Sequence, residues 1–270
     1  MKTISLLLLS LILFSCSTAR KFENKNVCFL IYDLQTKKFK KKINSSFCRE
    51  ELPAASTFKV PLALMAFDTE ILKDETTTIM WDHTPNTIEA WNKDHTAESW
   101  MKDSVVWYSQ AITPQIGQQK IEHYLRDFKY GNLDFSGGIK HAWLTPAPIN
   151  KEQIKNSLKI SGYGQVEFLA KFWNQTLPVS KHAFEMTKKI LPKEVNPPHR
   201  TIQGKTGSGF IDDEMKYRIG WYVAHLSVGA KDYIVVTNFV DNREMPQPRN
   251  YGGLEAKELT KQLLSEEDLW

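Results

Sequence analysis

Apolar residues occur with a helical period through most of the chain. An almost continuous apolar stretch at 56–72 predicts a mostly buried helix. Amphipathic spacing at 116–128 and 165–173 predicts two more helices, within a middle region (74–191) that is mainly helical with loops. The segment 254–264 predicts a helix that closes the chain.

Near both ends of the chain the pattern favours strands instead. β-Branched and aromatic residues there predict two hairpins, with strands at 27–33, 39–43, 217–226 and 232–240. Because strands at both ends enclose a helical middle, residues 20–270 are predicted to form one α/β domain of two lobes. A mostly antiparallel sheet would combine the N-terminal hairpin with the C-terminal strands, and an all-helical lobe would cover one side. The cleft between lobe and sheet edge is where chemistry is expected.

The N-terminus has the pattern of an export signal. Lys2 precedes an apolar run at 4–14, which is too short to span a bilayer but suits a signal-peptide core. Two processing routes stay open. Cleavage after the small residues Ser17-Thr18-Ala19 would remove 1–19, whereas a lipobox-like sequence ending at Cys16 would remove 1–15 and leave a lipid there. Both routes export the protein, and no second stretch is long enough to be a membrane anchor.

Cysteine usage agrees with export. With Cys16 assigned to the signal, Cys28 and Cys48 remain, and they flank the predicted N-terminal hairpin. An oxidising periplasm would allow a disulfide between them, but two separately buried thiols are the alternative.

Composition and charge exclude several classes of protein. The chain is 41% hydrophobic and 24% charged, as in ordinary globular proteins, which argues against disorder. A net charge of +4 without a long basic run argues against nucleic-acid binding. The histidines form no HxH or HExxH cluster, so a metallo-hydrolase is also disfavoured: they are His83, His95, His123, His141, His182, His199 and His225.

The first candidate for chemistry is Ser56-Thr57-Phe58-Lys59, at the start of the first predicted helix. Residues three apart there share a face, so the Ser56 hydroxyl and the Lys59 amine can meet. A serine hydroxyl is a poor nucleophile until a neighbouring base takes its proton, and backbone N–H groups at a helix start favour a developing oxyanion. An N-cap serine followed by a surface lysine is the alternative. However, Lys59 lies between Phe58 and Val60 in an apolar helix, where lysines are rarely buried without a role.

Three further motifs are individually unspecific. Lys205-Thr206-Gly207 precedes the predicted C-terminal strands and suits recognition of a carboxylate, although a turn at a strand edge is the favoured explanation of this motif taken alone. Ser104-Val105-Val106 is typical of a helix start. Tyr130-Gly131-Asn132 is typical of a turn that ends a helix.

The order and spacing of these motifs resemble the serine β-lactamase and penicillin-binding superfamily, and specifically the class D β-lactamases, or oxacillinases. The family pattern S-x-x-K, S-x-V, Y-G-N, W-L and K-T-G corresponds here to the four motifs above together with Trp143-Leu144. Family-like residues also lie between the motifs, so that the resemblance covers nearly all of the chain after the signal. It implies a three-layer fold with Ser56 at the lobe interface, and hydrolysis of penicillin-type antibiotics through a Ser56 acyl-enzyme.

The resemblance also implies a chemical modification of Lys59. Carbon dioxide would carboxylate the amine, which must be neutral to react, and burial lowers a lysine pKa. The apolar residues Phe58, Val106 and Leu144 would surround it, and the Trp143 indole N–H would donate to the carbamate. No metal or organic cofactor is implied.

The remaining roles concern proton transfer and substrate binding. Ser104, near Lys205, would relay a proton to the leaving nitrogen. The backbone N–H groups of Ser56 and Ser208 would form the oxyanion hole, while Thr206 would bind the substrate carboxylate and Tyr130 would shape the cleft wall. Arg249 is the candidate arginine for that carboxylate, with Arg243 as the weaker one.

Other readings stay open on the sequence. A penicillin-binding transpeptidase or a β-lactam sensor would be acylated but would not turn over. A transpeptidase usually carries a polar residue at the position of Val106, and a sensor would need a signalling partner. A non-catalytic periplasmic binding protein would leave Ser56 and Lys59 without a purpose. Both a monomer and a homodimer remain open, as does the range of β-lactams accepted.

Overall fold

The computed structural model describes residues 22, 24–145, 148–149, 152–153, 156–244 and 251–270. The predicted signal segment, Cys16 included, therefore lies outside the described residues. Among the residues described, no helix combines the length and apolarity needed to cross a membrane.

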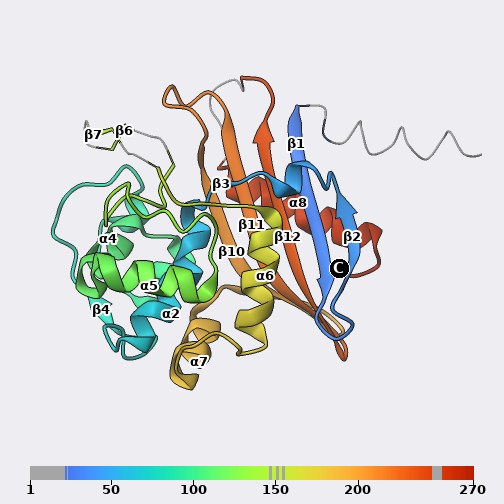
Figure 1. Cartoon of the computed structure of the whole chain (residues 1–270), viewed down its shortest axis with the longest axis horizontal. Helices are drawn as coiled ribbons and strands as arrows, with labels where there is room; N and C mark the ends of the chain where they lie inside the picture. Colours follow the sequence, from blue (N-terminus) through green and yellow to red (C-terminus); the bar gives the residue numbers. More distant parts are fainter. Residues whose placement is uncertain (1–21, 23, 146–147, 150–151, 154–155, 245–250) are drawn as a thin grey trace, which may run out of the picture.

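The centre of the molecule is a six-stranded antiparallel sheet in the order β2-β1-β12-β11-β10-β9. β1 pairs with β12, so that the N-terminal hairpin continues the C-terminal strands as predicted (Figure 1). The strands are β1 (Lys25–Asp33), β2 (Lys38–Ile43), β9 (Lys193–Asn196), β10 (Arg200–Phe210), β11 (Arg218–Val228) and β12 (Lys231–Asp241).

The helices form a lobe and two covering layers. The lobe comprises the 3-10 turn η2 (Ala55–Phe58) with α2 (Lys59–Asp68), α3 (Ala97–Asp103), α4 (Val106–Ile116), α5 (Gln118–Phe128) and α7 (Lys181–Ile190). The helices α6 (Gly162–Trp173) and α8 (Gly252–Glu266) lie against the sheet. The shorter elements are η1 (Phe47–Arg49), η3 (Glu89–Trp91), β3 (Leu52–Pro53), β4 (Thr78–Ile79), β5 (His95–Thr96), β6 (Pro148–Ile149), β7 (Glu152–Gln153) and β8 (Lys159–Ile160).

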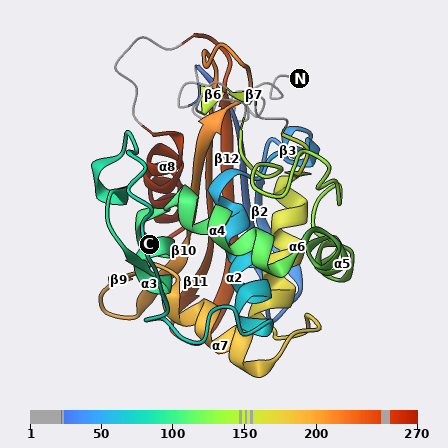
Figure 2. The same cartoon turned by 90° about the vertical axis from the view of Figure 1, so that its left-hand side faces the viewer.

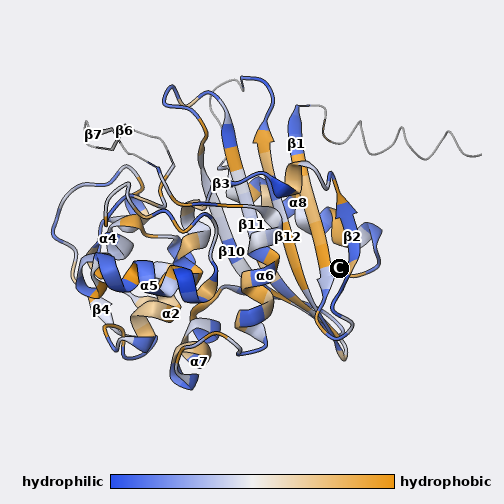
Figure 3. Cartoon of the chain, in the orientation of Figure 1, coloured by the Kyte–Doolittle hydropathy of each residue, from blue (hydrophilic) through white to orange (hydrophobic). Residues whose placement is uncertain are grey.

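Two apolar cores explain the layers. One core packs α8 on one face of the sheet through residues such as Phe29, Val235 and Leu264. The larger core joins the opposite face to α6 and the helical lobe through residues such as Leu30, Trp221 and Phe168. Because alternate side chains of a strand point to opposite faces, β1 contributes to both cores. The central strands β1 and β12 are therefore coloured as hydrophobic along most of their length, whereas α5 shows a hydrophilic outer face (Figure 3).

The outer strand β2 is an exception to this apolar pattern. Its sequence KFKKKI carries lysine at 38, 40, 41 and 42, and β2 pairs only with β1 within the described part of the chain. The strand was predicted at 39–43, and three of its four lysines lie within those bounds. Lys40 and Lys41 both contact the Glu267 carboxylate near the end of α8.

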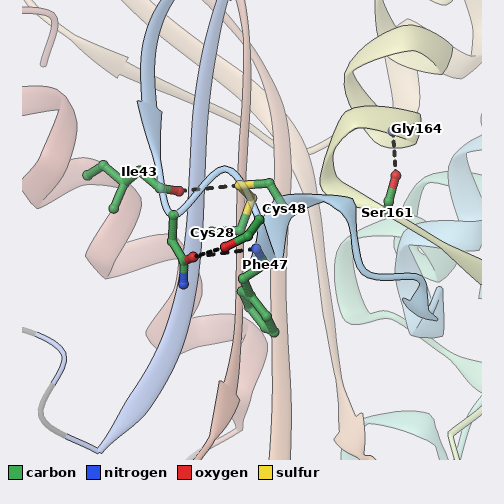
Figure 4. The surroundings of a disulfide bond; sticks show 8 residues. Cys28, Ile43, Phe47, Cys48, Ser161 and Gly164 are labelled. Atoms are coloured by element: carbon green, nitrogen blue, oxygen red, sulfur yellow. Dashed lines mark hydrogen bonds between the residues drawn. A yellow bond between two sulfur atoms is a disulfide. The ribbon is translucent and has the colours of Figure 1, made fainter.

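Cys28 and Cys48 form a disulfide, which decides between the two alternatives left by the sequence (Figure 4). Their Cα atoms lie 5.0 Å apart, within the range that a disulfide needs. The bond ties β1 to η1, a few residues before the turn that carries Ser56. Gly162, at the start of α6, lies so close that an added Cβ would be 2.8 Å from Cys28 Sγ. The disulfide is thus part of the packing between the sheet and α6.

Candidate active site

Ser56 and Lys59 meet at the junction of η2 and α2. Ser56 lies within the 3-10 turn and is partly exposed, whereas Lys59 begins the α-helix and is fully buried. Lys59 Nζ lies 3.2 Å from Ser56 Oγ. The helix predicted over 56–72 is therefore two elements, and α2 ends at Asp68. The tighter turn places the hydroxyl and the amine on one face, as the motif predicted.

The buried amine of Lys59 is tuned toward its neutral form. Burial among apolar side chains lowers the pKa of Lys59 well below its usual value of 10.5, and the positive charge of Lys205 lowers it further. A neutral amine can take a proton from the serine hydroxyl, and it can also react with carbon dioxide.

Lys205 and Ser104 form a second hydrogen-bonded pair, 3.0 Å apart between Nζ and Oγ. Ser104 caps α3 with φ 59°, a left-handed conformation that turns the chain sharply before α4. Burial and then the charge of Lys257 lower the pKa of Lys205 to about 7. Ser104 is partly exposed while Lys205 is buried, so the pair reaches from the interior to the surface. The pair can therefore pass a proton from Lys205 through Ser104 to a molecule bound at the surface.

The segment Lys205-Thr206-Gly207 precedes the two predicted C-terminal strands and lies inside β10, a strand that was not predicted. The glycines at 204, 207 and 209 hide this strand in the sequence, and each lies close to neighbouring atoms. A Cβ would lie 2.4 Å from the Val223 carbonyl oxygen at Gly204, 2.0 Å from Thr145 Oγ1 at Gly209, and 3.1 Å from Thr57 Cγ2 at Gly207, where β10 approaches η2. β9 pairs with β10 only at Arg200 to Gln203. The rest of β10 is therefore a sheet edge facing the helical lobe (Figure 2).

That edge presents the residues expected to bind substrate. Thr206 and Ser208 are both partly exposed on β10. The Ser208 hydroxyl accepts a hydrogen bond of 2.8 Å from the Gly253 main chain at the start of α8. This fixes Ser208, whose backbone N–H is the second expected oxyanion donor.

Trp143 closes the buried side of the site. It is fully buried and stacks on Phe58, the chain neighbour of Lys59, with ring centroids 5.4 Å apart. It also contacts Phe135, with ring centroids 6.1 Å apart, and Phe135 in turn contacts Phe58 at 5.8 Å. The indole Nε1 is buried and has no hydrogen-bond partner. A buried N–H donor without a partner destabilises the fold. The indole N–H is therefore available to donate a hydrogen bond to an acceptor group that binds in the site.

Two other apolar residues were expected around Lys59. Leu144 is buried, and Val106 is half-buried at the start of α4, where it packs against the larger core. Both positions therefore carry apolar side chains, as expected for the surroundings of a neutral amine.

Tyr130 supports the site from behind. Its side chain is fully buried, and its ring meets Phe58 edge-on at 5.9 Å. Its side chain does not reach the surface, so it can shape the cleft wall only through Phe58, and its place among the substrate-binding residues stays a prediction. Gln165, which the sequence did not single out, donates to Thr57 Oγ1 at 2.9 Å and to the Tyr130 hydroxyl at 3.5 Å. A glutamine in an otherwise apolar stretch of α6 was the signal that could have revealed it.

The arginine for the substrate carboxylate stays a prediction. Arg249 lies outside the described residues, and Arg243 is exposed at the end of the described segment after β12. Among the described residues, no group of three or more His, Cys, Asp or Glu side chains could hold a metal ion.

Comparisons with known proteins agree with this geometry. The penicillin binding protein transpeptidase domain family matches residues 23–265. Beta-lactamase OXA-1 from Escherichia coli is 40% identical over 228 residues, covering 82% of this chain and 78% of the relative. The probable beta-lactamase YbxI from Bacillus subtilis (strain 168) is 32% identical over 244 residues, covering 90% and 82%.

Solved structures agree as well. The class D beta-lactamase BAT-2 has a TM-score of 0.79 at 32% identity, covering 97% of this chain and 99% of that one. The C-terminal domain of the Bacillus licheniformis BlaR penicillin-receptor has a TM-score of 0.81 at 26% identity, covering 94% and 95%. Fold and site thus define a serine acyl-transfer protein of the penicillin-binding superfamily, and within it the chain belongs to the class D β-lactamases. It is a serine hydrolase of β-lactams.

The buried Lys205 predicts a pH-dependent stability. Its pKa is about 7 in the folded protein but 10.5 when exposed, so between these values the unfolded chain binds a proton that the folded chain lacks. The free energy of unfolding should therefore rise with pH above about 7. Lys205→Met removes the free-energy cost of burying a charged amine. At pH ~6 the variant should be more stable than the wild type by roughly 1–4 kcal/mol, and at pH ~9 the difference should be smaller, because Lys205 is then neutral in the folded protein.

Urea unfolding at both pH values measures this difference. Lys193→Met, at an exposed lysine on β9, controls for the methionine. A difference between Lys205→Met and wild type that is the same at both pH values would contradict the prediction.

Proposed function

We propose that this β-lactamase hydrolyses penicillins with Ser56 as nucleophile and carboxylated Lys59 as general base. The observation that carries the proposal is the fully buried Lys59 amine, 3.2 Å from Ser56 Oγ, combined with the partnerless indole N–H of Trp143. Burial holds the amine in the neutral form that carbon dioxide needs, and the indole is a donor for the carbamate oxygen. When carboxylated, Lys59 presents a carbamate oxygen as the general base.

Acylation then uses residues that the fold already holds in place. Ser56 Oγ loses its proton and attacks the β-lactam carbonyl carbon. The backbone N–H groups of Ser56 and Ser208 stabilise the oxyanion. As the carbon–nitrogen bond breaks, Ser104 gives its proton to the ring nitrogen and is resupplied by Lys205, 3.0 Å away. The proton that the Lys59 carbamate took from Ser56 then passes to Lys205, which frees the carbamate to act as a base again.

Deacylation returns the enzyme to its starting state. A water molecule attacks the Ser56 ester after losing its proton to the same base, and the ester oxygen takes the proton back as it leaves. Through both steps Thr206, on the open edge of β10, binds the substrate carboxylate.

Counting turnovers tests the proposal. Purified protein mixed with a molar excess of benzylpenicillin should hydrolyse many equivalents. A receptor or transpeptidase would stop after one acylation, and a non-catalytic binding protein would consume none. Release of no more than one equivalent at neutral pH with added bicarbonate would overturn it.

We also propose that the protein is exported to the periplasm, as a free protein or tethered through Cys16. The Cys28–Cys48 disulfide supports an oxidising compartment. Mass spectrometry of the protein from its native host tests the proposal, because recovery of the intact chain from Met1 in the cytoplasm would contradict it.

A further inference from the structure

Asn156 bridges the two ends of the loop that follows Trp143. Its amide Nδ2 donates to the carbonyl oxygen of Ala142 at 3.3 Å and also to that of Leu144. These two carbonyls belong to the residues on either side of Trp143. The main-chain N–H groups of Ser157 and Leu158 donate to the Ala142 carbonyl as well, at 3.1 and 2.9 Å. The peptide plane just before Trp143 and the one just after Leu144 are thus fixed from the far end of the loop.

The side chain of Trp143 has little freedom of its own. Its ring is fully buried and packs against both Phe58 and Phe135, at interplanar angles of 28° and 14°, and these two rings also contact each other at 5.8 Å. Sliding or tilting within this cluster depends on where the main chain holds the Cα atom. The direction of the indole N–H is therefore set by the main chain on both sides of residue 143.

Thr145, two residues after Trp143, contacts strand β10 on the opposite side of the site. Thr145 packs against β10 at Gly209, where a Cβ would lie only 2.0 Å from Thr145 Oγ1. The segment from Ala142 to Thr145 is consequently held by Asn156 at one end and by the β10 edge at the other.

The amide of Asn156 is not arranged for stability alone. Its Oδ1 atom is buried and has no hydrogen-bond partner. An unpaired buried amide oxygen destabilises a fold, so a residue serving stability alone would have this acceptor satisfied. The contribution of the side chain lies in its two N–H donors, and both are spent on the carbonyls beside Trp143.

We propose that Asn156 is a positioning residue for the reaction: it fixes the main chain around Trp143 and so holds the indole donor where carboxylated Lys59 needs it. The inference rests on the proposed function, since it assigns Asn156 to the maintenance of the carbamate. It does not place Asn156 in contact with substrate.

The test compares Asn156→Ala, Asn156→Ser and Asn156→Asp with the wild type. Alanine removes both donors, serine keeps one, and aspartate keeps the shape but turns oxygen atoms toward the two carbonyls. The bicarbonate concentration for half-maximal penicillin turnover should rise about 10- to 100-fold for Ala and Asp, and less for Ser. At saturating bicarbonate kcat should return to within a few-fold of the wild type, because the catalytic groups are all present.

NMR of the protein in labelled bicarbonate gives the second readout, the fraction of Lys59 carboxylated. Asn174→Ala, at an exposed asparagine ending α6, is the matched control and should behave as wild type. Thermal unfolding identifies any variant that fails to fold. If Asn156→Ala or Asn156→Asp fails to fold, Asn156→Ser alone is compared with the wild type.

The outcomes separate the two proposals. If the wild type carries the carbamate and the Asn156 variants keep it with an unchanged bicarbonate requirement, Asn156 has no positioning role, while the proposed function stands. A change in KM alone also overturns the inference. If the wild type itself shows no carbamate and no response to bicarbonate, the proposed function fails first.

Discussion

Ser56→Ala should abolish both covalent labelling by a penicillin and hydrolysis, with a loss of turnover of at least about 10⁴-fold. The substitution removes the hydroxyl that is proposed to form the acyl-enzyme, and among the described residues no other hydroxyl is hydrogen-bonded to Lys59 Nζ. The fold should survive, because Ser56 is partly exposed and a single side-chain contact is lost. Intact-protein mass spectrometry after incubation with benzylpenicillin measures the labelling.

Ser265→Ala, on α8, is the matched control and should label as wild type. A mass increase of one penicillin on Ser56→Ala would move the nucleophile elsewhere. Circular dichroism of both variants shows whether the fold is kept.

Removal of carbon dioxide should lower steady-state turnover by about 10²–10⁴-fold at mildly acidic pH, the usual contribution of a general base. Acid protonates the Lys59 amine, since protonation increases as the pH falls toward its lowered pKa, and an ammonium cannot bind carbon dioxide. Slow acylation should persist while deacylation fails. Added bicarbonate should restore turnover. Penicillin hydrolysis in degassed buffer, with and without bicarbonate, measures the effect.

The same loss should be produced by a charge at residue 106. Val106→Asp places a carboxylate at the start of α4, two residues after Ser104, and a carboxylate there favours the ammonium form of Lys59. Val106→Asn is the matched neutral control and should lose less activity. If turnover is insensitive to bicarbonate and both variants behave alike, Lys59 acts as a free amine.

The strands and helices with strong periodicity were predictable from sequence. β1, β2, β11 and β12 lie within two residues of their predicted ends, because apolar and β-branched residues dominate them. β10 was missed as a strand, because its glycines allow close approach to β11, η2 and Thr145 and have low strand propensity. Local patterns do not show such tertiary constraints.

The active site was predictable in its motifs but not in its support. Ser56 and Lys59 form the expected pair because their motif is short and folds locally. Ser104 and Lys205 lie 101 positions apart, and only the family resemblance predicted that they meet. Asn156 and Gln165 belong to no motif of that pattern, so neither spacing nor resemblance identified them. Tyr130 was predicted to shape the cleft wall, and its buried ring can do so only from behind, through Phe58.

The lysine-rich strand β2 bears on how molecules of this enzyme behave toward one another. An outer strand carries unpaired N–H and C=O groups that can extend a sheet into a neighbouring molecule, the first step of aggregation. On β2, four lysines in six residues would bring like charges together if two copies paired edge to edge, and Lys40 and Lys41 are themselves held by Glu267. Repulsion between these lysines therefore disfavours edge-to-edge pairing of two molecules through β2, even at high protein concentration. The opposite side of the sheet, along β10, can stay open for an antibiotic.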